Sequence, residues 1–323
     1  MTDSAQPPTL ATFGETMLRF SPPGNGRLET SDQFDVHVGG AESNVAVAAA
    51  RLGVESCWLS RLPDTRLGHR ITGRLQQHGV DPVVDWTAEG RVGTYYLEPG
   101  GKSRQTAVVY DRGGTPIRHV TPDDLATDRI RAADAFHVTG ITPALSATLA
   151  ETTADLLSLA GEADTTRVFD VNYRRKLWSP AEARETLTDL LPSVDVLVVA
   201  ERDAATVLDR DEPAEALARG LAADYDIDTV IVTEGAAGAT ALRDGDAYSQ
   251  ATFDAADTHP VGTGDAFVGG VLAADLSGEP LDRALATGAA TAALKREIPG
   301  DLATVDPAEV ERLLGGRDEG IAR

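Results

Sequence analysis

The stretch Val194-Asp195-Val196-Leu197-Val198-Val199 is apolar at five of its six positions. A strand of this composition is buried on both faces, as in a parallel sheet that helices cover. Residues 228–232 repeat the pattern, and β-type runs at 9–13 and 166–171 alternate with alanine- and leucine-rich helical stretches such as 147–159. This alternation predicts an α/β protein with three layers, α/β/α, built on a doubly wound and mostly parallel sheet with right-handed crossovers.

Two stretches interrupt the alternation, at about residues 15–38 and 91–115. In the second, runs at 93–97 and 106–110 flank a glycine-rich turn, which predicts an antiparallel ribbon. A hairpin of this size is not stable alone, so we expect the two stretches to form a small β-sheet lid over a cleft. No internal repeat or low-complexity linker stands out, so residues 1–323 are predicted to form one domain that includes this lid.

Charge narrows the range of partners. The chain of 323 residues has 29 Lys and Arg against 51 Asp and Glu, a formal net charge of −22. Such a surface repels polyanions, so nucleic acid and anionic membranes are not expected as partners and small molecules remain. Of the basic residues 26 are arginine, and only Lys102, Lys176 and Lys295 are lysine. This composition fits either a salt-adapted protein or an ordinary acidic cytosolic protein.

Cysteine content and hydropathy indicate in which cellular compartment the protein is expected. The single cysteine, Cys57, excludes an intramolecular disulfide and a cysteine-rich metal site, and it fits a reducing environment. The N-terminal segment lacks a basic stretch followed by an apolar one, and no run of about eighteen apolar residues occurs. We therefore expect no signal peptide, no membrane span and a cytoplasmic location.

The segment Val261-Gly262-Thr263-Gly264-Asp265 leads from a loop into the apolar helical pattern of residues 266–276. The backbone N–H groups of its Gly-Thr-Gly stretch would converge on an anion where the helix dipole adds partial positive charge. An acid there would repel a phosphate, unless it takes the proton of a hydroxyl that attacks the phosphate. Asp265 is therefore either a catalytic base or the N-cap of the helix, and the spacing alone does not decide between them.

Three further turns end predicted strands or open predicted helices. Gly39-Gly40-Ala41-Glu42-Ser43-Asn44 either brings polar groups close to a polyol or is only a helix entry turn. Asp170-Val171-Asn172-Tyr173-Arg174 places three polar side chains at the end of a strand, as ligands or as solvent-exposed groups. Thr233-Glu234-Gly235-Ala236-Ala237-Gly238 suits either a nucleotide or a plain hairpin. Because open α/β sheets bind ligands at the carboxyl ends of strands, these turns are expected to line one crevice.

Taken together and in this order, the motifs at 39–53, 233–238 and 261–267 resemble those of the ribokinase-like (PfkB) carbohydrate kinase family. Within that family, residues 169–178 and 14–18 are most similar to the 2-keto-3-deoxygluconate kinases, here with a halophile's composition. The resemblance implies ATP, Mg²⁺, and a homo-oligomer formed through the lid. It also implies phosphorylation of the terminal hydroxyl of 2-keto-3-deoxygluconate, giving 2-keto-3-deoxy-6-phosphogluconate.

The resemblance assigns roles to individual residues. Asp265 would deprotonate the sugar hydroxyl, and the amides of residues 262–264 would hold charge on the transferred phosphoryl group and bind the nucleotide phosphates. Arg112 would bind the carboxylate that distinguishes a sugar acid from a neutral sugar. The other assignments are Gly40, Asn44, Tyr95, Tyr110 and Asp301 to the sugar, Asn172 and Arg174 between sugar and phosphates, Thr233, Gly235 and Gly238 to the nucleotide, and Asp203 to Mg²⁺ through water.

Three departures from the family pattern and two alternatives remain open. Asp203 stands where many members have a glutamate near the metal, and Thr263 stands where the anion-binding turn usually has alanine. His259 stands where the family usually has an acid tied to monovalent-cation activation, so a need for potassium is not decided, and we interpret His259 as a structural turn residue. A neutral-sugar kinase of the fructokinase or ribokinase type is the nearer alternative. A catalytically inactive sugar or nucleotide sensor is the other, although Asp265 and its glycines argue against it.

Overall fold

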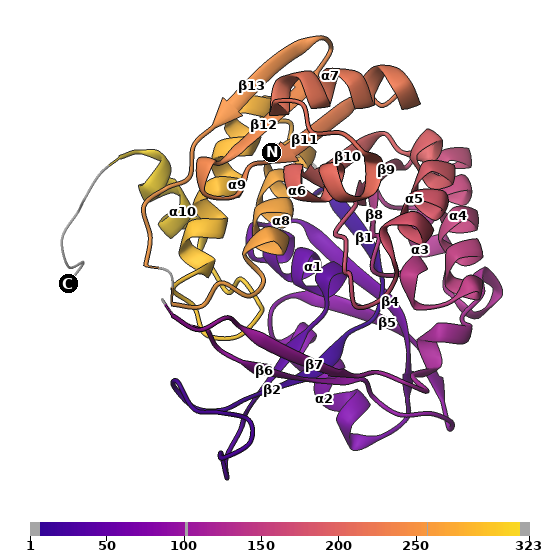
Figure 1. The fold of residues 1–323 in the computed structure, drawn as a ribbon. Helices are drawn as coiled ribbons and strands as arrows, with labels where there is room; N and C mark the ends of the chain where they lie inside the picture. Colours follow the sequence, from indigo (N-terminus) through magenta and orange to yellow (C-terminus); the bar gives the residue numbers. More distant parts are fainter. Residues whose placement is uncertain (1–6, 101–102, 257, 317–323) are drawn as a thin grey trace, which may run out of the picture.

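The computed structural model describes residues 7–100, 103–256 and 258–316. Within these ranges a nine-stranded main sheet runs through the molecule (Figure 1). Its strands are β1 (Thr9–Phe13), β4 (Glu55–Pro63), β5 (Val80–Thr87), β8 (Ala135–Thr139), β9 (Thr166–Asp170), β10 (Val196–Ala200), β11 (Thr229–Thr233), β12 (Ala239–Arg243) and β13 (Asp246–Gln250).

The strand order is β13-β12-β11-β10-β9-β8-β1-β4-β5. The strands from β11 to β5 pair in parallel, whereas β12 and β13 form an antiparallel hairpin at one edge. All parallel strands therefore end at the same edge of the sheet, where α/β proteins bind their ligands. The predicted mostly parallel sheet is confirmed.

Helices cover both faces of this sheet (Figure 1). Successive side chains of β1 point to opposite faces of the sheet. Leu10 packs with one helical layer, and Ala11 and Phe13 pack with the other. The first layer holds α1 (Ala41–Arg51), α2 (Arg66–Gln76), α8 (Thr263–Leu276) and α9 (Leu281–Lys295), and the second holds α3 (Asp128–Arg131), α4 (Ala147–Glu162), α5 (Pro180–Leu190) and α7 (Ala214–Tyr225). The predicted three-layer α/β/α fold is confirmed.

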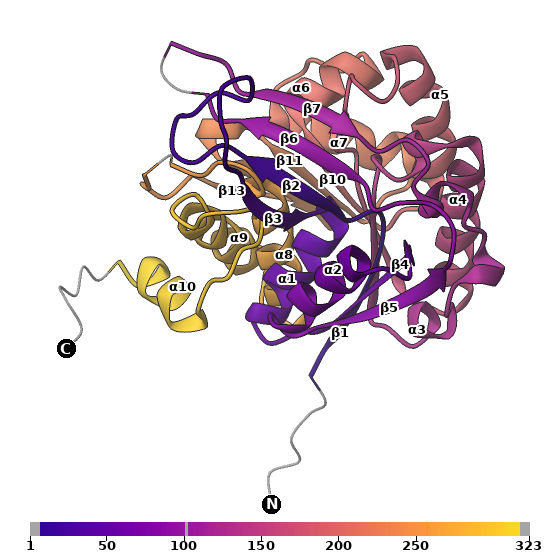
Figure 2. The ribbon, with the colours of Figure 1, turned by 90° about the horizontal axis from the view of Figure 1, so that it is seen from below.

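A second sheet of four strands forms the lid. Its strands are β2 (Met17–Ser21), β3 (Asp35–Gly39), β6 (Thr94–Glu98) and β7 (Ala107–Asp111), in the order β3-β2-β6-β7. β6 and β7 are antiparallel, as predicted, and β2 joins β6 in parallel. Figure 2 shows the lid as a separate layer beside the main sheet. Met17, Tyr95 and Leu97 of the lid pack with Val261, so the lid contacts the loop before α8.

The sequence analysis missed β5. This strand contains Pro82 and is interrupted by Asp81 and Asp85, unlike the nearly apolar runs further along the chain. Proline is tolerated there because β5 is the outermost strand, beyond β4. After Thr233 the chain turns back, since β12 pairs antiparallel to β11 with Ala239 opposite Thr233, and nucleotide binding by this turn stays a prediction.

Close packing fixes α8 against α1. A Cβ atom added at Gly269 of α8 would lie 2.4 Å from the Cβ of Ala48 and 2.8 Å from the carbonyl oxygen of Val45. No side chain fits in that gap, so glycine lets the two helices approach. Because both helices begin at the carboxyl edge of the sheet, this contact sets the positions of their first turns relative to each other.

Gly269→Ala should therefore lower the free energy of unfolding by about 1–3 kcal/mol through overpacking. The matched control is Gly73→Ala in α2, where an added Cβ meets nothing within 4 Å. That change should raise stability by about 0.5–1 kcal/mol through helix propensity. Denaturant unfolding of the two variants measures both effects, and equal stabilities would contradict the close contact of α1 and α8.

Candidate active site

The first turns of α1 and α8 bring together Asn44 and Asp265. The Nδ2 atom of Asn44 donates a hydrogen bond of 2.6 Å to Oδ2 of Asp265. The N-cap of α8 is Gly262, at φ 82°, and Thr263 Oγ1 donates to the carbonyl oxygen of Pro260 at 2.8 Å. Asp265 is the third residue of the helix, so the N-cap alternative for this carboxylate is wrong.

Backbone N–H groups at the start of α8 are free of intrahelical acceptors. The first such bond joins the N–H of Ala266 to the oxygen of Gly262, at 2.9 Å, whereas the N–H of Thr263 makes a 3.3 Å turn contact with Pro260. The N–H groups of Gly264 and Asp265 precede the first helical hydrogen bond and lie at the positive end of the dipole. A Cβ atom at Gly264 would meet nothing within 4 Å, so this turn is open to a ligand.

Three carboxylates share this edge of the sheet. Desolvation raises the pKa of Asp265 to about 6, against a hydrogen bond from Asn44 and the charge of Arg174. Desolvation, followed by the charge of Asp265, raises the pKa of Asp170 to about 7. Burial also raises the pKa of Asp203, which accepts a 3.3 Å hydrogen bond from the N–H of Tyr173. The charges of Asp265 and Asp203 both disfavour ionisation of Asp170.

The turn after β9 shapes this acidic cluster. Asn172 has a left-handed backbone, with φ 37°, which asparagine tolerates better than most residues. Its N–H and Nδ2 atoms donate to Asp170 at 3.1 and 3.3 Å, so its side chain is directed at that carboxylate. Arg174 Nη1 contacts the carbonyl oxygen of Tyr173 at 3.2 Å, and its charge reaches both Asp170 and Asp265.

Asp301 joins the lid to the first turn of α8. Its carboxylate accepts a hydrogen bond from the hydroxyl of Tyr95 and lies 3.2 Å from Nη1 of Arg19. Added Cβ atoms would lie 2.7 Å from this carboxylate at Gly39 and 2.1 Å from the backbone oxygen of Asp301 at Gly262. The lid, the entry to α1 and the entry to α8 thus all pack on one buried residue.

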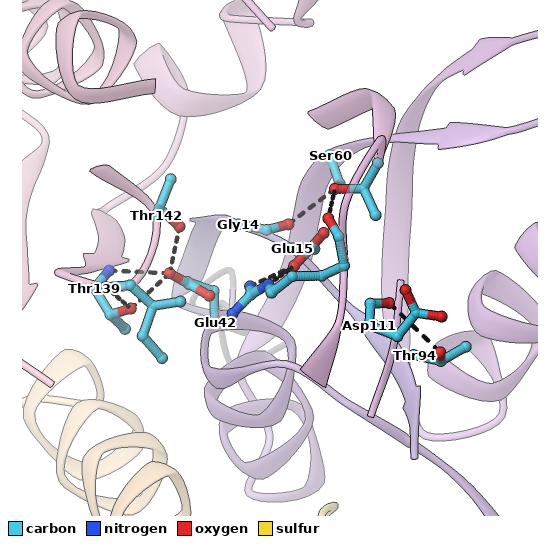
Figure 3. A network of polar contacts seen from close by, with 11 residues as sticks. Gly14, Glu15, Glu42, Ser60, Thr94, Asp111, Thr139 and Thr142 are labelled. Atoms are coloured by element: carbon cyan, nitrogen blue, oxygen red, sulfur yellow. Dashed lines mark hydrogen bonds and ion pairs between the residues drawn. The ribbon is translucent and has the colours of Figure 1, made fainter. Parts of the chain in front are cut away.

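Arg112 extends from the end of the lid. Its Nε and Nη2 atoms donate to Oε2 of buried Glu15, and its guanidinium lies 5.6 Å from the ring centre of Tyr110. Figure 3 shows Glu15 in this network, beside Gly14 and Ser60. The guanidinium is therefore oriented by a protein carboxylate on one edge, which leaves Nη1 for another acceptor.

The residues expected to bind the nucleotide follow β11. Thr233 ends this strand, and Gly235 and Gly238 have φ values of 62° and 121°. A Cβ at Gly238 would lie 2.0 Å from the oxygen of Gln250, so this glycine is required by the hairpin of β12 and β13. Gly235 meets nothing within 4 Å and is the more accessible of the two.

The acidic cluster fits a hydrated divalent cation better than a dehydrated one. Across the described ranges, no three or more His, Cys, Asp and Glu side chains are grouped as ligands of one metal. Asp170 and Asp203 nevertheless place two carboxylates of raised pKa beside each other, an arrangement that a cation would stabilise. Mg²⁺ commonly retains several waters and uses one or two carboxylates, so both residues suit it.

A family model described as pfkB family carbohydrate kinase matches residues 8–307. The chain belongs to the pfkB family of carbohydrate kinases. Membership confirms the predicted family and the prediction of a phosphotransferase enzyme, which argues against the inactive-sensor alternative.

Relatives within the family match the whole length of the chain. The 2-dehydro-3-deoxygalactonokinase of Haloferax volcanii is 54% identical over 97% of this chain and 99% of its own. The 2-dehydro-3-deoxygluconokinase of Thermoproteus tenax is 33% identical over 95% and 94%, respectively. The crystal structure of 2-dehydro-3-deoxygluconokinase from Thermotoga maritima has a TM-score of 0.90 at 31% identity, covering 96% of this chain and 99% of that one.

Sequence reasoning missed two buried charged residues that support the site. Oε1 of Glu42 accepts hydrogen bonds from the N–H of Thr139 at 3.2 Å and from the hydroxyls of Thr139 and Thr142 at 2.8 Å each (Figure 3). Burial raises its pKa to about 7. A charged residue inside an alanine-rich helical stretch is the only sequence signal that could have indicated this role.

Lys295 is the second. It is fully buried, and its Nζ atom donates to the carbonyl oxygens of Ile298 at 3.0 Å and His259 at 3.3 Å. Burial lowers its pKa to about 8, against the charges of Asp301 and Asp265. The backbone N–H of His259 also bonds to the end of α9, at 2.8 Å from the oxygen of Arg296. Lys295 therefore ties the loop before α8 to α9.

No helix in the described ranges is long and apolar enough to cross a membrane.

The pKa of Asp265 sets an expected pH dependence. If Asp265 is the base that the sequence predicts, only its ionised carboxylate accepts a proton, so kcat/KM should rise with pH up to about 6 and fall about tenfold per pH unit below it. Asn44→Ala removes a hydrogen bond that favours the ionised form, so it should move this acidic limb to higher pH. Initial rates measured across pH at constant KCl give the acidic side of this profile. A profile that falls only near the ordinary pKa of aspartate, or one that Asn44→Ala does not shift, would contradict the role of Asp265 as the base.

Proposed function

We propose that this chain transfers the γ-phosphoryl group of ATP to the terminal primary hydroxyl of a 2-keto-3-deoxy sugar acid. The observation that carries the proposal is the placement of Asp265, with its Asn44 hydrogen bond, beside free backbone N–H groups at the start of α8. A carboxylate in the first turn of a helix is stabilised by the helix dipole, but it opposes the binding of a phosphate at the same terminus. Proton abstraction from the attacking hydroxyl would give this carboxylate a role beside a bound phosphate.

The reaction follows from the groups around Asp265. A pKa of about 6 leaves the carboxylate ionised near neutral pH yet basic enough to accept the hydroxyl proton as the oxygen attacks. The N–H groups of Gly264 and Asp265 and the dipole of α8 stabilise negative charge on the transferred phosphoryl group. Arg174, whose charge acts on both Asp170 and Asp265, adds positive charge on the other side. Catalysis here is positioning plus electrostatic stabilisation.

Nucleotide and metal are assigned to the edge formed by β9, β10 and β11. Asp170 and Asp203 would hold Mg²⁺ through water, with Thr233, Gly235 and Asn172 toward the nucleotide. Mg²⁺, when bound, neutralises charge on the phosphates. Formation of a homo-oligomer through the lid remains a prediction.

The substrate class rests on Arg112 and on the relatives. A guanidinium oriented by Glu15 and Tyr110 presents Nη1 to a substrate carboxylate, a contact that a neutral sugar does not need. The sequence analysis names 2-keto-3-deoxygluconate, and relatives at 33% and 31% identity carry that name. The relative at 54% identity is named for the galactonate epimer. We therefore place 2-keto-3-deoxygalactonate first and 2-keto-3-deoxygluconate second.

Asp265→Asn should lower kcat by about 10²–10⁴-fold and leave the KM for the sugar acid within a few fold, because amide and carboxylate have the same shape. A coupled ADP-release assay in KCl measures both constants. Asp123→Asn, an exposed aspartate outside the site, is the matched control and should behave as wild type. Wild-type turnover by Asp265→Asn would refute the assigned base.

Arg112→Gln should reduce kcat/KM for both 2-keto-3-deoxy acids by about 10²-fold or more, since it removes the charged partner of the substrate and leaves Glu15 unpaired. Arg104→Gln, on the same lid but paired with Glu98, should have little effect. The assay compares the two epimers with fructose and ribose. Equal rates of wild type on the acids and the neutral sugars would favour the neutral-sugar alternative, and absence of ADP release with every substrate would favour the sensor.

A further inference from the structure

A pocket of about 530 Å³ lies on the other side of Asp301, outside the catalytic cleft. Its walls are the edge strand β3 of the lid, helix α2 and the loop at 299–304. Asp301 is part of this wall, but Asn44, Arg112 and Asp265 are not. The volume is in the range of pockets that hold small metabolites. The proposed kinase reaction gives this pocket no role.

Basic side chains dominate the pocket. His37, His69, Arg70 and Arg74 line it. His69 is paired with Asp64 at 2.8 Å, and Asp301, the acid among the described lining residues, is paired with Arg19 and Tyr95. Burial, followed by the charge of Arg19 and then of Arg74, lowers the pKa of His37, against the charges of Asp301 and Asp35, so His37 faces the pocket as a neutral imidazole. Arg70 and Arg74 therefore carry the positive charge of the pocket wall, in a protein whose net charge is −22.

Folding does not explain these arginines. Arg66, Arg70 and Arg74 repeat every four residues on α2, so they share one face and repel one another. Within the described part of the chain, no carboxylate lies within 4 Å of these three guanidinium groups. Many arginines of this acidic surface are ion-paired, as Arg283 is with Glu311 at 2.7 Å, although exposed Arg175 and Arg312 also have no ion pair among the described residues. These three arginines form a row on α2, the cationic stripe, and two of them line the pocket without a carboxylate partner. Such a charge pattern is typical of an anion-binding site.

We propose that this pocket binds a small polyanion, a metabolite carrying phosphate or carboxylate groups, through Arg70, Arg74 and His37. Arginine forks bind phosphate and carboxylate oxygens in the same planar geometry, so both ligand chemistries suit the site. Gln77, whose Oε1 accepts a 3.1 Å hydrogen bond from Arg74, orients that side chain toward the pocket wall.

The pocket shares a wall with the catalytic cleft. Gly300, at φ 94°, packs against the ring of His37, and the next residue is Asp301, which contacts Tyr95 of the lid. A ligand on His37 therefore touches the segment that holds Asp301. Occupancy should change the KM for the sugar acid more than kcat, because Asp301 lies on the sugar side of the proposed site.

Isothermal titration calorimetry with pyrophosphate tests the site, using enzyme already saturated with a non-hydrolysable ATP analogue and the sugar acid so that the cleft is filled. The wild type should bind one equivalent, and Arg70→Gln/Arg74→Gln should weaken binding at least tenfold. Arg66→Gln is the matched control, since it removes one charge from the same stripe without lining the pocket, and it should bind within about threefold of wild type.

The same titration with citrate and with a hexose 6-phosphate distinguishes carboxylate from phosphomonoester ligands, and binding of either supports the site. Failure of all three probes to bind would overturn it. So would equal losses in Arg66→Gln and the double variant, which would indicate general attraction to the surface. Because binding is measured without turnover, a failure here is separate from a failure of the proposed kinase reaction. Binding that leaves the KM unchanged would overturn the coupling through Asp301.

Discussion

The buried carboxylate of Asp301 is the contact on which the geometry of the site depends. It lies between the hydroxyl of Tyr95 on the lid and the guanidinium of Arg19, while its backbone oxygen packs on Gly262 at the start of α8. Two glycines in the recognisable motifs, Gly39 and Gly262, are explained by this arrangement, because a side chain at either would enter the space that Asp301 occupies. Packing around Asp301 therefore accounts for part of the glycine pattern in these motifs.

The site concentrates acids in a protein that is already strongly acidic. Desolvation raises the pKa of Asp170, Asp203 and Asp265, and the charges of Asp265 and Asp203 add to the shift of Asp170. Backbone N–H groups, Arg174 and Lys295 supply the local positive charge that makes this tolerable. Salt screens surface charges over a few ångströms but acts weakly on desolvated ones, so the balance within the cleft is set by these residues and by the ligands.

Sequence patterns predicted the features that depend on neighbouring residues. The apolar strand at 194–199 and its repeats indicated the parallel sheet, and the Gly-Thr-Gly-Asp segment indicated the glycine-rich start of α8. Features that depend on distant pairs were not predictable from pattern. Glu15 and Arg112 are 97 residues apart, and Tyr95 and Asp301 are 206 apart. Local composition does not indicate which buried polar side chains contact each other across such separations.

The lid draws on two segments of the chain, joined through the parallel pairing of β2 and β6. Moving either segment alone would break the hydrogen bonds of this pairing. Tyr95 on β6 and Arg19 on β2 also contact one carboxylate, that of Asp301, so displacing the lid from Asp301 would break both contacts at once. Because the backbone oxygen of Asp301 packs at Gly262, this one residue connects both segments of the lid to the start of α8.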